Sequence, residues 1–135
     1  MKKLELEATV ENIEKVTDFI NAELEAAGCP ARAQIQIDVA IDEIFSNIAN
    51  YAYAPGTGGA VVVYELLTDP RAVEITFFDR GMPFNPLENT DPDVTLPAEE
   101  RQVGGLGVFL VKKTMDDVSY EYRDGQNILR IMKKI

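Results

Sequence analysis

The order of apolar and polar residues predicts that short strands and helices alternate along the chain. Residues 3–8 alternate apolar and polar positions, as a strand with one buried face does. Residues 9–28 carry apolar side chains at helical spacing, and Gly28 stands where a glycine commonly ends a helix. Pro30 then precedes a second helical pattern, which runs from about 31 to 54. The first part of the chain is therefore expected to form one strand and two helices.

The remainder of the chain carries mainly strand patterns. Residues 60–67 and 72–79 are rich in β-branched and aromatic side chains, and a turn sequence separates them. Residues 118–134 predict a β-hairpin whose turn is formed by Asp124 and Gly125. With one more helix ahead of this hairpin, the order of elements predicts an α+β two-layer sandwich. We expect one mixed, mostly antiparallel sheet with the helices on one face.

Residues 81–104 form a long polar segment that contains four prolines. Unstructured stretches of this length inside a compact domain commonly serve a function, such as a lid over a site. The segment leads into Gly104, Gly105 and Gly107, directly ahead of an apolar helical run. A glycine-rich turn that enters a helix offers unpaired N–H groups and the positive end of the helix dipole, which suit a phosphate. The alternative is a tight turn without a ligand.

Composition limits the functions that these elements can serve. The chain has 135 residues, of which 46% are apolar, so we expect a single domain over residues 1–135. Thirteen basic residues against 23 acidic ones give a net charge of −10, which argues against nucleic acid as a partner. The absence of histidine excludes phosphohistidine chemistry, histidine bases and histidine-ligated metals within this chain.

Cysteine usage and hydropathy favour a cytoplasmic location. The one cysteine, Cys29, cannot form an internal disulfide, which fits a reducing compartment. The start of the sequence has two lysines but lacks the apolar run that follows them in a signal peptide. Apolar runs also stay far below the roughly 18 residues that a membrane span needs, so no membrane contact is expected.

Glu43, Asn47 and Asn50 lie on one side of the second predicted helix, opposite its apolar stripe. A carboxylate and an amide one turn apart can act as a general base and a magnesium ligand, because Mg²⁺ prefers hard oxygen donors. Asparagine is also a poor helix former, so its presence on this face favours a function. The alternative is an ordinary solvated face. Asp42 lies off this face and is a weaker candidate for the base.

The stretch FFDRGMPFNP places Asp79 at the end of a predicted strand and Gly81 two residues later. A carboxylate at a strand end can accept a hydrogen bond from an exocyclic amine such as that of adenine. We expect Asp79 to lie near the surface, and Gly81 to let a flat base approach the backbone closely. The alternative is an ordinary Asp-Arg-Gly turn. Neither the P-loop pattern nor the dinucleotide-binding fingerprint occurs in the sequence.

Three segments taken together resemble a known superfamily. DEIFSNIANYAY, DRGMPFNP and GGLGVFLVKKTMDDVSY, in this order, resemble the N, G1 and G2 boxes of the GHKL ATPases, which include gyrase and the histidine kinases. Within that superfamily the chain is most similar to the stand-alone anti-sigma-factor serine/threonine kinases of the RsbW kind. The resemblance covers nearly the whole chain. It implies the Bergerat α/β sandwich, with ATP held between the helices and the lid.

The resemblance also implies a role for individual residues. Glu43 matches the general base of the family, and Asn47 matches the residue that binds Mg²⁺. Asp79 matches the aspartate that binds the amino group of adenine, and Gly81 matches its partner glycine.

The resemblance implies further contacts with the phosphates. Gly105 and Gly107 would hinge the lid and offer N–H groups to them, and Arg101 would reach the γ-phosphate. Two positions depart from the family pattern. Residues 51–52 stand where relatives often have His-Gly, and Asn127 lies near where a threonine or serine often supports the adenine site.

By this resemblance the chain is a kinase that uses ATP and Mg²⁺ to phosphorylate a serine or threonine of a partner protein. The implied partner is an anti-anti-sigma protein of the STAS-like class, and a sigma factor is a second candidate; a homodimer stays open. The alternative function is a non-catalytic module that binds its partner in response to nucleotide. The presence of both Glu43 and Asn47 favours the enzyme, since a pure nucleotide sensor could lose the base.

Overall fold

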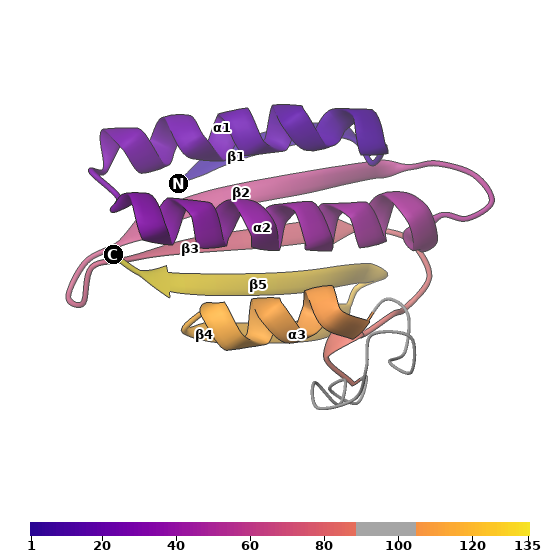
Figure 1. Cartoon of the computed structure of the whole chain (residues 1–135). Coiled ribbons are helices and arrows are strands. Elements are labelled where there is room, and N and C mark those ends of the chain that lie inside the picture. Colours follow the sequence, from indigo (N-terminus) through magenta and orange to yellow (C-terminus); the bar gives the residue numbers. More distant parts are fainter. Residues whose placement is uncertain (89–104) are drawn as a thin grey trace.

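An antiparallel sheet forms one layer of the molecule, and helices cover one of its faces (Figure 1). The structure is a computed structural model that describes residues 1–88 and 105–135. In these residues five strands lie in the order β1-β2-β3-β5-β4 across the sheet. Their bounds are β1 Lys2–Glu7, β2 Gly59–Leu67, β3 Ala72–Asp79, β4 Asp117–Arg123 and β5 Gln126–Lys134.

The predicted α+β two-layer sandwich is confirmed, with one correction to the sheet. The sequence predicts a mixed sheet, whereas all four pairings among the described strands are antiparallel. The order of the strands explains this difference. Neighbouring strands in the sheet run in opposite directions. The segment that contains α3 leads from β3 to β4, and β4 pairs with β5 at the edge of the sheet rather than with β3.

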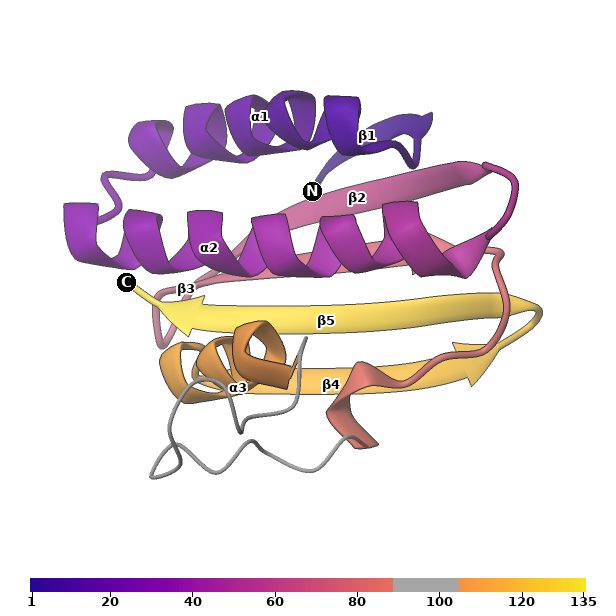
Figure 2. The same ribbon diagram turned by 45° about the vertical axis from the view of Figure 1, so that its right-hand side comes forward.

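In the described part of the chain, three α-helices lie side by side on the covered face, with α2 between α1 and α3 (Figure 2). Helix α1 packs against β2, α2 against β5 and α3 against β4. None of the helices in the described ranges is long and apolar enough to cross a membrane. The helix bounds are α1 Ile13–Ala26, α2 Ala31–Asn47 and α3 Gly105–Thr114, and shorter helical segments are η1 Val10–Asn12, η2 Ile48–Ala52 and η3 Pro86–Glu88.

Two predicted chain reversals are confirmed by backbone angles. Gly28 follows α1 with a φ of 69°, in the left-handed region that lets a glycine end a helix. Asp124 and Gly125 have φ values of 55° and 77°. Positive φ at both central residues is the requirement of a two-residue hairpin turn whose twist matches the strands.

The second predicted helix differs from the structure at its end. Regular α-helix stops at Asn47, and the next five residues, Ile48–Ala52, form a π-helix instead of continuing to residue 54. A π-helical turn rotates later side chains relative to those of α2, and such turns are frequent at functional sites. Asn50 therefore no longer shares the face that an unbroken α-helix would give it with Glu43 and Asn47.

The core between sheet and helices fixes the rotation of α2. Its side chains Ile37, Ile41 and Phe45 are fully buried, and each such side chain contributes roughly 1.5–3 kcal/mol when it leaves water. Phe77 of β3 and Ile131 of β5 are buried in the same cluster. Because this apolar face of α2 points at the sheet, Glu43 and Asn47 are held on its flank.

Candidate functional site

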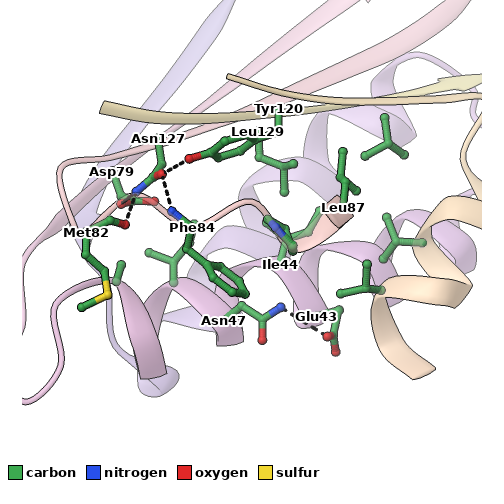
Figure 3. A pocket seen from close by; sticks show the side chains of 16 residues that line it. Glu43, Ile44, Asn47, Asp79, Met82, Phe84, Leu87, Tyr120, Asn127 and Leu129 are labelled. Carbon is green, nitrogen blue, oxygen red and sulfur yellow. Dashed lines mark hydrogen bonds between the residues drawn. The ribbon is translucent and has the colours of Figure 1, made fainter. Parts of the chain in front are cut away.

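A pocket opens between α2, the ends of the central strands and α3 (Figure 3). About 600 Å³ of space lies between the lining atoms, a volume that includes open solvent at the mouth. Its lining is mainly apolar, with a few polar groups. The lining residues are Glu43, Ile44, Asn47, Ile48, Ala52, Asp79, Met82, Phe84, Pro86, Leu87, Val108, Val111, Val118, Tyr120, Asn127 and Leu129.

Glu43 and Asn47 face one another along the flank of α2. Asn47 Nδ2 donates a hydrogen bond to Glu43 Oε1 at 3.3 Å. An ionised carboxylate can only accept, so this contact turns the Asn47 amide nitrogen toward Glu43 and leaves Oδ1 as the atom offered to a metal. Both side chains are half-buried, and the predicted pair is thus brought together in one pocket.

Burial makes Glu43 a stronger base than an exposed glutamate. Loss of solvent raises the pKa of the Glu43 carboxyl, and the negative charge of Asp42 raises it further. The hydrogen bond from Asn47 acts in the opposite direction and is smaller than the effect of burial. A carboxylate with a raised pKa accepts a proton more readily, which is the property expected of a general base.

Helix α3 approaches Glu43 closely at Gly107. A Cβ built at Gly107 would lie closer than 3.0 Å to Glu43 Oε2, a separation that real Cβ atoms essentially never show. Gly105 is the first residue of α3, and the first N–H groups of a helix lack partners within that helix. Contact of Gly105 and Gly107 with phosphates stays a prediction. Their place at the start of a helix beside Glu43 is compatible with it.

Asp79 ends β3 as predicted, but its expected position near the surface is wrong. Only 5% of the residue is exposed, because β2 and β5 flank it on both sides in the sheet. Gly81 N and Asn127 Nδ2 each donate a hydrogen bond of 2.9 Å to Asp79 Oδ1. Both hydrogen bonds that the Asp79 carboxylate accepts from residues 1–88 and 105–135 end on this oxygen. Oδ2 is therefore the oxygen that a ligand in the pocket can address.

The structure gives Gly81 a different neighbour from the one that the sequence suggests. A Cβ at Gly81 would overlap the backbone carbonyl of Ala52, the last residue of the π-helix. Met82 N donates a 2.9 Å hydrogen bond to the same carbonyl. Glycine is required here because two backbone segments touch. The predicted approach of a base to Gly81 stays a prediction, and Gly81 is not among the residues that line the pocket.

Two further candidates do not join this group. Asp42 and Asn50 are exposed and do not line the pocket. Arg101 and the greater part of the predicted lid over residues 81–104 lie outside the described residues. The described beginning of that segment does contribute to the pocket, through Phe84, Pro86 and Leu87.

Sequence reasoning missed Tyr120 and the full role of Asn127. Tyr120 on β4 donates its hydroxyl proton to Asn127 Oδ1, and both residues line the pocket. Alternation along β4 places Tyr120 on the same face as Val118, which packs against the core, and that pattern is a signal that could have identified it. Contacts between Asn127 and residues 79–84 depend on strand order, which no local pattern specifies.

Comparison with known proteins decides the family. The model of the histidine kinase-like ATPase domain matches residues 6–133. The chain belongs to this family. The predicted resemblance to the GHKL ATPases is thereby confirmed, and the antiparallel sheet with helices on one face agrees with it.

Relatives of this histidine kinase-like ATPase domain carry kinase names. The chain is 30% identical over 101 residues to serine/threonine-protein kinase BtrW of Bordetella bronchiseptica, across 75% of this chain and 70% of that protein. It is 32% identical over 95 residues to serine-protein kinase RsbW of Bacillus cereus and to that of Bacillus mycoides. Those matches cover 67% of this chain but only 58% of each Bacillus kinase, less than two thirds of its length.

Proposed function

We propose that this chain is a serine/threonine protein kinase that binds ATP with Mg²⁺ and transfers the γ-phosphoryl group to a hydroxyl of a partner protein. One observation carries the proposal: Glu43, Asn47 and Asp79, predicted as base, metal ligand and adenine ligand, line a single pocket. They come from α2 and from the end of β3, so only the folded chain joins them. The kinase names of the relatives support the same class of enzyme.

The adenine end of the pocket is assigned to Asp79. A carboxylate oxygen that is not used by Gly81 or Asn127 can accept a hydrogen bond from an exocyclic amine. The apolar side chains of Ile48, Val111 and Leu129 line the same pocket and can bury a flat base. The chemistry of this lining fits adenine because it combines one fixed acceptor with apolar walls.

The phosphate end is assigned to Asn47 and the start of α3. Within the described residues no group of three or more acidic or cysteine side chains gathers to hold a metal. A single Asn47 oxygen fits Mg²⁺ nevertheless, because this ion usually keeps several waters and takes further oxygens from nucleotide phosphates. When bound, Mg²⁺ would neutralise charge on the phosphates. Arg101 and the N–H groups of Gly105 and Gly107 are proposed to add to this neutralisation.

Glu43 is the proposed general base. Its carboxylate would accept the proton of the attacking serine or threonine hydroxyl, while the new O–P bond forms and the bond between the γ-phosphorus and the leaving ADP oxygen breaks. Asn47 holds one carboxylate oxygen of Glu43, and Gly107 leaves room for the other. Phosphoryl transfer depends mainly on positioning and charge stabilisation, so this small set of groups suffices.

The proposed partner is an anti-anti-sigma protein of the STAS-like class, and a sigma factor is a second proposed partner. Residues 1–135 are proposed to form one kinase domain that acts in the cytoplasm, and a homodimer is proposed as its assembly. These assignments come from the resemblance to stand-alone anti-sigma-factor kinases, since the names of the relatives state only a serine or threonine kinase.

Incubation with γ-labelled ATP, Mg²⁺ and a candidate anti-anti-sigma protein tests the proposal. We expect label on one serine or threonine of the partner, and none when that residue is replaced by alanine or when Mg²⁺ is chelated. Nucleotide-dependent binding of the partner without transfer of label would instead favour the non-catalytic switch. Absence of ATP binding would contradict both functions.

A further inference from the structure

Asn127 is a buried polar residue at the centre of the pocket wall. It lies on β5 directly opposite Asp79 in the register of the β3–β5 pair, and only 6% of it is exposed. A buried amide costs free energy unless its donors and acceptors are paired. The partners of Asn127 therefore indicate what the residue does.

The amide of Asn127 is fully paired, and its partners come from three segments (Figure 3). Its Nδ2 donates to Asp79 Oδ1 and to the carbonyl oxygen of Met82, each at 2.9 Å. Its Oδ1 accepts from Phe84 N at 3.2 Å and from the hydroxyl of Tyr120. Two N–H donors and two acceptor sites are the whole capacity of an amide side chain. These partners also fix which end of the amide is nitrogen.

The hydroxyl of Tyr120 supports this arrangement. A tyrosine hydroxyl is protonated at neutral pH, and burial raises the pKa of Tyr120 further, so this hydroxyl can donate its proton to Asn127. With Oδ1 of Asn127 engaged by Tyr120 and Phe84, Nδ2 must face Asp79. One oxygen of Asp79 is thereby held, and the carboxylate cannot rotate without breaking a paired network.

We propose that Asn127 is a positioning residue that makes the pocket selective for purine nucleotides with an exocyclic amine. It locks the Asp79 carboxylate toward the pocket and ties residues 82–84 to the same wall. A serine or threonine at this position has a single hydroxyl proton and cannot bridge both groups. The inference deepens the proposed function and rests on it, since it takes the pocket to be the ATP site.

A purely structural role for Asn127 makes a different forecast. Loss of the hydrogen bonds of Asn127 would then lower the stability of the domain and weaken the binding of all nucleotides equally. Selectivity is the property that separates the two roles, because it compares two ligands in the same variant. The useful pair is ATP and purine riboside triphosphate, which lacks only the exocyclic amine.

Calorimetric titration of both nucleotides with Mg²⁺ tests the inference in wild type, Asn127→Ala, Asn127→Ser and Tyr120→Phe. We expect wild type to prefer ATP by about tenfold or more, as loss of a hydrogen bond to a charged group allows. The alanine variant should lose most of this preference, and the serine variant should lose less, because its one hydroxyl proton can still be donated to Asp79. Tyr120→Phe should lose less, because it removes one partner of the amide. Gln126→Ala, a neighbour on β5 outside the pocket, should keep the wild-type preference.

The preference for ATP should not fall further when Asn127→Ala is added to Asp79→Asn, because the first residue acts through the second. An unchanged preference in a folded Asn127→Ala variant would overturn the inference and leave the proposed function intact. If the alanine variant fails to fold, Tyr120→Phe decides the question, and an unchanged preference in that variant would overturn the inference. Wild-type protein that binds neither nucleotide would contradict the proposed function itself, and the inference with it.

Discussion

Glu43 Oε2 occupies the space that a side chain at Gly107 would need. Glu43 lies on α2 and Gly107 in the first turn of α3, and the two helices contact one another. The missing side chain lets the start of α3 reach the candidate base. Gly107 therefore has a structural role besides any contact with a phosphate, and a mutation at this position can test that role.

We predict that Gly107→Ala folds normally but transfers phosphate slowly. The atoms that must give way are at the end of the flexible Glu43 side chain, and alanine is favoured over glycine in a helix by about 1 kcal/mol. A displacement of a reacting group by ~1 Å can cost about 100-fold in rate. Thermal unfolding and the rate of label transfer, measured on the same preparation, check both parts. A wild-type rate would argue against the assigned place of Glu43 in the reaction.

Gly81→Ala is the matched control for Gly107→Ala, and we expect it to destabilise the fold. Its new methyl group would meet the backbone of Ala52, which cannot move aside without shifting the π-helix. Overpacking of this kind typically costs about 1–3 kcal/mol, so the midpoint of thermal unfolding should fall by several degrees. Equal melting temperatures for Gly81→Ala and wild type would show that the contact with Ala52 is not restrictive.

Asp79→Asn should weaken ATP binding while the domain stays folded. Asparagine retains an oxygen for the donors Gly81 N and Asn127 Nδ2, but it offers a donor where the carboxylate offered an acceptor. Loss of a charge-assisted hydrogen bond costs roughly 1.5–3 kcal/mol, which is about a ten- to hundredfold rise in Kd. Calorimetry with Mg-ATP measures this change, and Asn50→Ala, an exposed residue outside the pocket, is the control. A folded Asp79→Asn protein with wild-type affinity would remove the adenine assignment.

The raised pKa of Glu43 predicts how stability depends on pH. In the unfolded chain the carboxyl has its ordinary pKa, whereas burial raises that pKa in the folded protein. Between the two values the folded state binds more protons, so stability falls as pH rises through this window. The penalty is absent below the ordinary pKa and complete above the raised one.

Glu43→Gln removes this penalty because glutamine does not ionise. Relative to wild type, the variant should gain little thermal stability at about pH 3.5 and more at about pH 7. The effect of burial on Asp38, whose pKa is also raised, is common to both proteins and cancels in the comparison. A stability difference that stays constant between these pH values would contradict the burial of the Glu43 charge.

The sequence predicts local structure well where a single element determines it. Strand β3 has the predicted bounds, because its β-branched and aromatic run is bordered by turn residues on both sides. Asp124 and Gly125 form the predicted turn since few other pairs adopt positive φ at both positions. The pairing of Glu43 with Asn47 follows from one helical turn, and the structure retains it.

Features that depend on distant segments could not be predicted in the same way. The π-helix Ile48–Ala52 ends where its last carbonyl meets Met82 N, a partner supplied by another element. Burial of Asp79 depends on both neighbouring strands, and the contacts of Asn127 with Asp79 and Tyr120 depend on the order in which strands join the sheet. Periodicity contains no information on these neighbours.

The central claim is that Glu43 performs the chemistry while Asn47 supports nucleotide binding. Glu43→Gln keeps the shape of the side chain and the acceptor for Asn47 Nδ2, but it removes the basic carboxylate. Its affinity for Mg-ATP should match wild type, while phosphoryl transfer falls by about 100-fold or more, as is typical when a general base is lost. Asn47→Ala should weaken the binding of Mg-ATP and slow phosphoryl transfer. Asn50→Ala should have a smaller effect on both quantities.

The rate of transfer from γ-labelled ATP to the serine of an anti-anti-sigma partner, measured beside ATP affinity in wild type and Glu43→Gln, tests this claim most directly. The account predicts that the variant binds ATP as tightly as wild type and labels the partner at about one hundredth of the rate or less. Transfer at the wild-type rate by Glu43→Gln would contradict the role of Glu43 as the general base.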